Sequence, residues 1–216
     1  MSVKEKLQEF KSNIPDSVTL VAVSKTKPAE MIQDAYQSGH LDYGENKAQE
    51  MQAKAKELPK DIRWHFIGHL QRNKVKYIAP HVHLIHSVDS LRLLREINKR
   101  AGNEERVIDV LLQVYIAKEE SKYGLDEEEV IEIMESDDFK SFENVKVIGL
   151  MGMATNTDNM ETVRREFKSL KTFFDKIKQQ YDFSILSMGM TNDYEIAVEE
   201  GSTMLRVGSA IFGARS

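Results

Sequence analysis

A lysine at the end of the first predicted strand has the chemistry to bond covalently to an aldehyde. Lys25 follows the apolar run Thr19–Val23. The two-residue period of a strand places Lys25 on the same face as Val21 and Val23. An amine held away from water has a lowered pKa and, once neutral, attacks a carbonyl carbon to form an imine. Lysines at strand ends are more often simply solvated, and Lys27 could face the same way. Position alone therefore leaves Lys25 a candidate.

Glycines and hydroxyl side chains follow two later strands in a pattern that suits phosphate binding. Gly189 and Gly208 would let an anion approach the backbone closely. Three hydroxyl side chains near these glycines could donate hydrogen bonds to an anion: Ser187, Thr191 and Ser209. Ordinary strand-to-helix turns also favour glycine and serine, so the same pattern is compatible with turns that bind nothing.

The histidines raise the possibility of a metal centre. His81, His83 and His86 lie in one segment, and His81 and His83 share a strand face. They come at or near the start of the fourth predicted strand, away from the end where the other candidates lie. We therefore expect no metal site. His69 differs from them because it follows the third strand.

Short apolar runs alternate with helical patterns along the whole chain, which predicts a parallel sheet. Eight such units in one domain, residues 1–216, predict a single (β/α)8 TIM-type barrel, although an open doubly wound sheet stays possible. The predicted strands are Thr19–Val23, Leu41–Tyr43, Arg63–Ile67, Val82–Ser87, Val107–Tyr115, Val145–Met151, Ser184–Met188 and Thr203–Val207.

The segments between the strands have helical spacing. The clearest apolar stripe, in steps of three and four residues, runs along Met160, Val163, Phe167, Leu170, Phe174 and Ile177. Ser90 is a suitable N-cap for another helix. Val3–Phe10 is an extra amphipathic helix before the first strand, and we expect it to be structural, as a lid on the lower mouth of the barrel.

Active sites of such barrels lie at the C-terminal ends of the strands. This rule selects the polar, glycine-containing stretches at one end of the predicted barrel. They are Ser24–Pro28, Gly44–Asn46, Gly68–Lys74, Ser187–Asp193 and Arg206–Ser209.

Composition excludes several classes of protein. The net charge of −5 has its two signs interspersed, so we expect no nucleic-acid partner. The absence of cysteine rules out disulfides and thiolate chemistry. We find no secretory signal and no run of the roughly 18 apolar residues that a membrane span needs. These features predict a cytoplasmic protein.

Five motifs in order closely resemble the pyridoxal phosphate homeostasis proteins, a family similar to the barrel domain of alanine racemase. They are AVSKTKP at 22–28, YGEN at 43–46, WHFIGHLQRNK at 64–74, SMGM at 187–190 and STMLRVGSAIFGAR at 202–215. With the order of elements, the resemblance covers nearly the whole chain. The segment SMGMTND departs from the usual SMGM-S-x-D, which leaves the role of Thr191 open.

The resemblance implies a site for pyridoxal 5'-phosphate (PLP). Lys25, rather than Lys27, would hold PLP as a Schiff base, and Arg206 would face the pyridine nitrogen. The phosphate would be bound by Ser187, Gly208 and Ser209. The other residues expected in the cofactor pocket are Asn46, His69, Gly189, Met190 and Thr191.

The resemblance also implies a function without turnover. A cation opposite the ring nitrogen opposes its protonation and so weakens the electron sink of PLP. Alanine racemase tolerates this because a tyrosine from an added C-terminal domain supplies a second base across a dimer. Here the sequence ends four residues after Phe212, so we expect no such domain.

We therefore expect a carrier and buffer of PLP in vitamin B6 and amino-acid homeostasis, acting as a monomer in transient contact with apoenzymes. The alternative is a small PLP-dependent amino-acid racemase.

Overall fold

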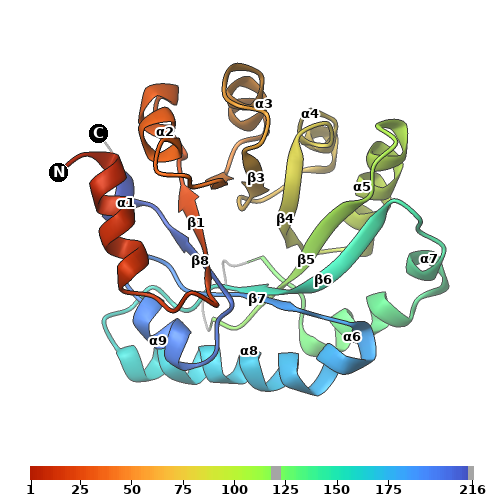
Figure 1. The fold of residues 1–216 in the computed structure, drawn as a ribbon. Helices are drawn as coiled ribbons and strands as arrows, with labels where there is room; N and C mark the ends of the chain where they lie inside the picture. Colours follow the sequence, from red (N-terminus) through yellow and green to blue (C-terminus); the bar gives the residue numbers. More distant parts are fainter. Residues whose placement is uncertain (118–122, 214–216) are drawn as a thin grey trace.

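Eight parallel strands close on themselves into a barrel, and helices form a ring around it (Figure 1). The computed structural model describes residues 1–117 and 123–213. Neighbouring strands pair in sequence order, and β8 closes the barrel on β1, with Val21 opposite Arg206. The predicted (β/α)8 barrel is confirmed, and the open sheet is excluded. The strands are β1 Thr19–Val23, β2 Asp42–Glu45, β3 Arg63–Phe66, β4 Val82–Val88, β5 Ile108–Val114, β6 Val145–Gly152, β7 Ile185–Ser187 and β8 Met204–Val207.

The helices alternate with the strands, as the sequence predicts. No helix within the described ranges is long and apolar enough to cross a membrane. The helices are α1 Val3–Ser12, α2 Ala29–Tyr36, α3 Ala48–Glu57, the 3-10 helix η1 Arg72–Lys74, α4 Val75–Ile78, α5 Leu91–Asn103, α6 Glu127–Glu135, α7 Asp137–Lys140, α8 Met160–Tyr181, α9 Tyr194–Glu199 and α10 Ser209–Phe212.

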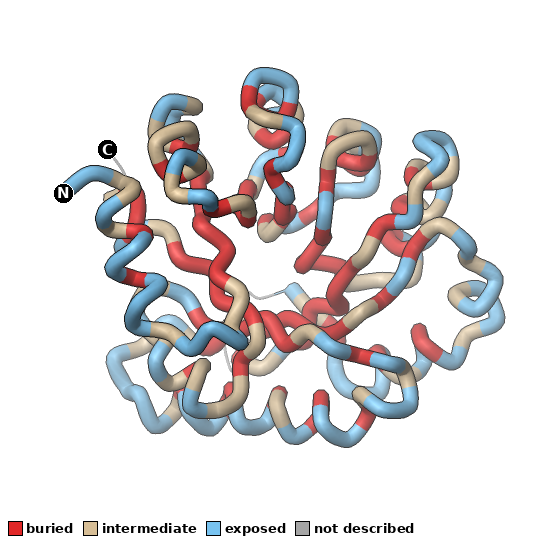
Figure 2. Tube along the Cα trace, in the orientation of Figure 1, coloured by how far each residue is buried: buried red, intermediate tan, exposed pale blue. Residues whose placement is uncertain are grey.

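The barrel has two apolar regions, and Figure 2 shows that buried residues follow the strands and the helix faces turned toward them. The larger region lies between strands and helices and includes the predicted stripe of α8 from Val163 to Ile177. The smaller one fills the barrel interior with Val21, Leu84, Leu111, Met151 and Met204. Burying each such side chain contributes roughly 1.5–3 kcal/mol.

Strand β1 has the two faces that the two-residue period predicts. Val21 belongs to the interior cluster, whereas Leu20 and Ala22 belong to the cluster that faces the helices. The face that leads to Lys25 is therefore the interior face of the barrel.

Helix α1 does not act as the expected lid. Its Ser2 and Glu5 form a reciprocal capping box at the N-terminus, and Leu7 and Phe10 are its buried residues. The helix packs beside α2 and α10 in the outer ring, and the Phe10 ring lies 4.7 Å from that of Tyr194 (Figure 1). The apolar side of α1 is covered by α2 and α10, so it is not available to cover the lower mouth of the barrel.

Candidate functional site

The ends of β1 and β8 meet closely at the C-terminal mouth of the barrel. A Cβ atom on Gly208 would lie 3.2 Å from the carbonyl oxygen of Val23 and 3.3 Å from its Cβ. Lys25 is partly buried and comes two residues after Val23. The hydroxyl of the intervening Ser24 points the other way, 2.6 Å from Glu45 Oε1. Lys25 follows in the turn after β1, at the end of the barrel where Gly208 approaches Val23.

A buried ionic cluster fixes the backbone on both sides of Lys25. Lys54 Nζ donates to Glu45 Oε1 at 2.7 Å, to Glu50 Oε1 at 2.8 Å and to the Ser24 carbonyl at 2.9 Å. The backbone N–H of Thr26 donates to the same Glu50 oxygen at 2.6 Å. Thr26 has a φ of 64°, a conformation that costs a non-glycine residue energy unless its surroundings hold it. The cluster thus holds the turn that carries Lys25.

Burial and hydrogen bonding shift the pKa of the Glu45 carboxyl in opposite directions. Burial raises the pKa of its carboxyl to about 7, although the attraction and hydrogen bond of Lys54 and the hydrogen bond from Ser24 oppose this rise. Its second oxygen, Oε2, is buried and has no hydrogen-bond partner among the described residues. Keeping Glu45 ionised beside Lys54 therefore costs free energy of folding, and this cost changes with pH as the Glu45 carboxyl titrates.

Three of the predicted phosphate ligands lie together where the loop after β7 meets α10. Thr191 and Ser209 approach each other to 3.2 Å between hydroxyl oxygens, next to Gly208. The backbone N–H of Met190 is held by Asp193 Oδ1 at 2.6 Å. We call Thr191, Gly208 and Ser209 the hydroxyl cup.

Gly189 determines the shape of this loop. Its φ is 98°, and a Cβ there would lie 2.5 Å from the Cβ of Ala197. Its carbonyl oxygen accepts the backbone N–H of Arg206 at 3.0 Å. Gly189 therefore joins the end of β7 to β8 and leads the chain toward Met190 and Thr191.

Arg206 is buried below the mouth and donates two hydrogen bonds to neutral oxygens. Its Nη1 donates to Ser187 Oγ at 2.6 Å, and its Nη2 donates to the Gly152 carbonyl at 3.1 Å. Burial lowers the pKa of Arg206 to about 10, while the charge of Asp193 opposes this, so the guanidinium stays cationic at neutral pH. A cation is thus fixed on the interior side of β8, two residues before Gly208.

Ser187 lies with Arg206 and apart from the hydroxyl cup. Its side chain is fully buried, and its hydroxyl contacts Arg206 and also His86 Nδ1, at 3.0 Å. Both partners lie in the barrel interior, so this hydroxyl is already used. The structure thus gives this hydroxyl two partners inside the barrel, and phosphate binding by Ser187 stays a prediction. Sequence reasoning placed Ser187 by its position at a strand end, which does not tell which way the side chain points.

Asn46 and His69 lie at different depths of the mouth. Asn46 Oδ1 is buried and has no hydrogen-bond partner among the described residues, so it can accept a hydrogen bond from a ligand. His69 is exposed at the rim, stacked on Tyr123 with ring centroids 4.2 Å apart, and its Nδ1 is 3.6 Å from Asp89. Asn46 fits the predicted pocket, whereas His69 marks its edge.

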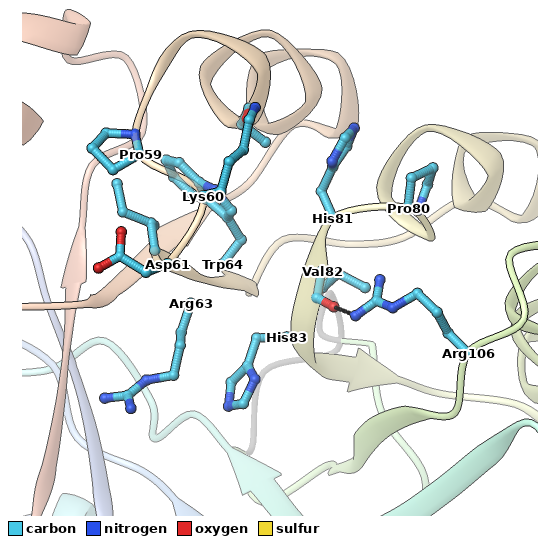
Figure 3. A pocket seen from close by; sticks show the side chains of 12 residues that line it. Pro59, Lys60, Asp61, Arg63, Trp64, Pro80, His81, Val82, His83 and Arg106 are labelled. Carbon is cyan, nitrogen blue, oxygen red and sulfur yellow. Dashed lines mark hydrogen bonds between the residues drawn. The ribbon is translucent and has the colours of Figure 1, made fainter.

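A pocket rich in basic groups lies at the opposite end of the barrel. Figure 3 shows Arg63, His83 and Arg106 among its side chains, which surround about 420 Å³ at the N-terminal ends of β3 and β4. His81 also lines it, so the predicted lower position of His81 and His83 is confirmed. Within residues 1–117 and 123–213 no three or more His, Asp or Glu side chains gather as metal ligands would.

Two sets of site residues were not predicted from the sequence. One is Lys54 with Glu45 and Glu50 behind Lys25. The other is a chain of hydrogen bonds through His86 and His65 below Arg206. Glu45 belongs to the YGEN motif, and an acidic residue inside an apolar strand is a signal that could have pointed to a buried partner.

Comparisons with known proteins identify the family of this chain. The family model for the alanine racemase N-terminal domain matches residues 2–216. Of the last motif, only Ala214 and Arg215 lie outside the described residues. The chain is 43% identical over 199 residues to the pyridoxal phosphate homeostasis protein of Aquifex aeolicus, covering 91% of this chain and 86% of that protein.

Solved structures show the same fold. PipY of Synechococcus elongatus PCC7942, solved with PLP bound, superimposes with a TM-score of 0.88 at 36% identity, covering 98% of this chain and all of PipY. Alanine racemase of Clostridium difficile is 16% identical with a TM-score of 0.78, and the match covers 99% of this chain and 60% of the racemase, which shows the shared fold alone. On the family match and the identity to its relatives, the chain belongs to the pyridoxal phosphate homeostasis protein family.

Proposed function

We propose that this chain binds PLP covalently through Lys25 and acts as a carrier and buffer of the cofactor. The observation that carries the proposal is the meeting of β1 and β8, which brings Lys25, Arg206 and the hydroxyl cup to one mouth of the barrel. PipY, a relative that shares 36% of its residues, was solved with PLP bound.

The residues present suit the chemical groups of PLP. When bound, PLP supplies an aldehyde that an amine can capture and a ring that withdraws electrons. Thr191 and Ser209 can donate hydroxyl hydrogen bonds to a phosphate, and the missing side chain of Gly208 leaves its backbone accessible. Asn46 Oδ1 is a buried acceptor in need of a donor. Arg206 has N–H groups beyond its two described bonds for an acceptor such as a ring nitrogen.

The side chains around the mouth favour holding the cofactor over turnover. A racemase needs bases on both faces of the substrate carbon, within hydrogen-bond reach of its proton. Tyr43 packs among the residues between sheet and helices, near His40 and Trp64, and so points away from the interior. His69 lies exposed on the rim. The charge of Arg206 further opposes protonation of a ring nitrogen placed beside it.

The cellular setting follows from the carrier role. We place the protein in the cytoplasm. A reducing environment breaks disulfides, and a chain without cysteine has none to break. We take it to be a monomer that transfers PLP in transient contacts with apoenzymes.

The attachment site is tested by trapping. Protein loaded with PLP is reduced with borohydride, digested and mapped by mass spectrometry. The adduct should lie on Lys25. Lys25→Ala should lose the yellow absorbance of the imine that borohydride removes, and the matched control Lys27→Ala should keep it. An adduct on Lys27, or a reducible imine that persists in Lys25→Ala, would refute the assignment.

A further inference from the structure

A chain of hydrogen bonds crosses the barrel interior below the proposed cofactor site. From Ser187 Oγ it runs to His86 Nδ1 at 3.0 Å, then from His86 Nε2 to His65 Nδ1 at 2.9 Å, and from His65 Nε2 to Asp42 Oδ1 at 2.9 Å. Arg206 joins its upper end through Ser187. We call these five residues the interior relay, and none is more than 6% exposed.

The relay is built from strands that are far apart in the sequence. Asp42 lies on β2, His65 on β3, His86 on β4, Ser187 on β7 and Arg206 on β8. Burying polar groups is costly unless each one is hydrogen-bonded, and one broken link leaves its neighbours unsatisfied. The interior also holds an apolar cluster of Val21, Leu84, Leu111, Met151 and Met204. Buried polar residues at this position therefore indicate a function that apolar side chains could not perform.

Only the first hydrogen bond of the relay has a direction that chemistry alone fixes. Arg206 has no acceptor, so it must donate to Ser187 Oγ. Taking the Ser187 hydroxyl as the donor to His86 Nδ1, its other described partner, leaves the proton of His86 on Nε2. Burial lowers the pKa of His86 well below its usual value, which keeps this ring neutral.

The lower end completes the same direction. His86 Nε2–H donates to His65 Nδ1, so His65 carries its own proton on Nε2 and donates it to Asp42. Burial favours a neutral Asp42, but hydrogen bonds from His65 and Arg63 outweigh it and hold the pKa of this carboxyl well below its usual range. Asp42 is therefore an anion at neutral pH.

Arg63 closes the relay at the lower pocket. Its Nε donates to Asp42 Oδ1 at 2.8 Å and its Nη2 to Oδ2 at 2.5 Å, and its side chain is 46% exposed. Figure 3 shows Arg63 near His83 at this end. The relay thus runs from a buried cation under the cofactor site to an anion anchored at the opposite mouth, with every donor pointing the same way.

We propose that His86 and His65 are positioning residues that hold the Arg206 guanidinium, through Ser187, in the orientation in which it meets the ring nitrogen of PLP. This inference rests on the proposed function. A hydroxyl alone can rotate, whereas a hydroxyl whose proton is committed to His86 keeps its lone pairs toward Nη1 of Arg206. Gly152 fixes Nη2 in the same way.

The test compares PLP with its deaza analogue, in which a C–H group replaces the ring nitrogen. Both probes carry the same aldehyde and phosphate, so only PLP can report on Arg206. In His86→Leu the preference for PLP over the analogue should fall about three- to tenfold, where tenfold corresponds to about 1.4 kcal/mol. In His86→Asn the amide oxygen can accept from Ser187 in place of Nδ1, so much of the preference should return.

Two control variants separate positioning from general damage. His83→Leu removes a histidine on the same strand that packs against His65 at 5.5 Å but lies outside the relay, so the preference should be unchanged. Ser209→Ala, in the hydroxyl cup, should weaken both probes by the same factor. Ser187→Ala also breaks the relay but removes only one hydroxyl group, so it replaces His86→Leu in the test if that variant fails to fold.

A second readout needs no cofactor. Nitrogen-15 NMR of the PLP-free protein should show the proton of His86 and the proton of His65 on Nε2. A proton on Nδ1 of either ring, or equal losses for the two probes in His86→Leu and Ser187→Ala, would overturn the positioning role. Wild-type protein that captures neither probe would instead overturn the proposed function.

Discussion

Replacing Glu45 by glutamine should change how the stability of the protein depends on pH. Glu45 is fully buried and bonded to Lys54 and Ser24. Glutamine has the same shape and keeps a carbonyl oxygen that can accept both hydrogen bonds, and Lys54 retains Glu50 as its anionic partner. The substitution therefore removes the ionisation of Glu45 with little change in packing.

The sign follows from proton linkage. Burial raises the pKa of Glu45 from its ordinary value of 4.5 to about 7 in the folded chain. Between these values the folded state binds more protons than the unfolded state, so this group loses stability as pH rises from about 4.5 to about 7. The loss from this group is on the order of 3 kcal/mol. Glutamine does not titrate, so Glu45→Gln should gain about this amount relative to the wild type between pH 4.5 and pH 8.

The assay is urea unfolding of the PLP-free protein at several pH values in this window. Glu50→Gln is the matched control, because Glu50 binds the same lysine but has its pKa lowered, against the effect of burial, by its hydrogen bonds to Lys54 and Thr26. Its stabilising contribution is lost only as pH falls below about 4.5. In Glu50→Gln the free energy of unfolding should therefore still fall between pH 5 and pH 8, as in the wild type, because Glu45 remains, and the fall should be only slightly smaller because the charge of Glu50 helps to raise the pKa of Glu45. If the free energy of unfolding of Glu45→Gln changed with pH in the same way as that of the wild type, the raised pKa of Glu45 would be refuted.

Two further predictions concern the proposed site. Gly208→Val should press against the Val23 carbonyl oxygen, which a Cβ would already approach to 3.2 Å; we expect about 1–3 kcal/mol of lost stability in urea unfolding and at least about tenfold weaker PLP binding by absorbance titration. Unchanged binding would mean that this turn does not face the cofactor. Amino acids mixed with PLP-loaded protein in heavy water should leave without deuterium at Cα, by proton NMR. Rapid exchange that is lost in His69→Ala or Tyr43→Phe would show a working base and contradict the carrier role.

Much of the fold could be predicted because its signals are local. The predicted first strand matches β1 residue for residue, and the α8 stripe is buried from Val163 to Ile177. The second strand was placed too early, since Gly44 and Glu45 belong to β2 and were expected after it. A glycine and a charged residue do not look like a strand, and here Lys54 makes the buried carboxylate possible.

The polar interior could not be predicted, because its members are neighbours only after the barrel closes. Asp42, His65 and His86 come from three strands, and each in isolation looks like a polar residue on a solvated strand. The extra helix α1 was misplaced for a similar reason. Its amphipathic pattern shows that one side is covered, but the position of the covering helices α2 and α10 depends on the ring.

The positions of Tyr43 and Glu45 bear on the proposal that this barrel holds an aldehyde and does little chemistry on it. In the YGEN segment, alternate residues face opposite sides of β2. Tyr43 and Glu45 share the side toward the helices, where Tyr43 packs with Trp64 and Glu45 meets Lys54. Gly44 takes the interior side, where a Cβ would lie 3.1 Å from Val21 and from Ile67. The carboxylate of Glu45 thus holds the turn of Lys25 through Ser24 and Lys54, and the Tyr43 hydroxyl is buried on the same side without a hydrogen-bond partner among the described residues. On the interior side, β2 carries Gly44, which has no group that can transfer a proton.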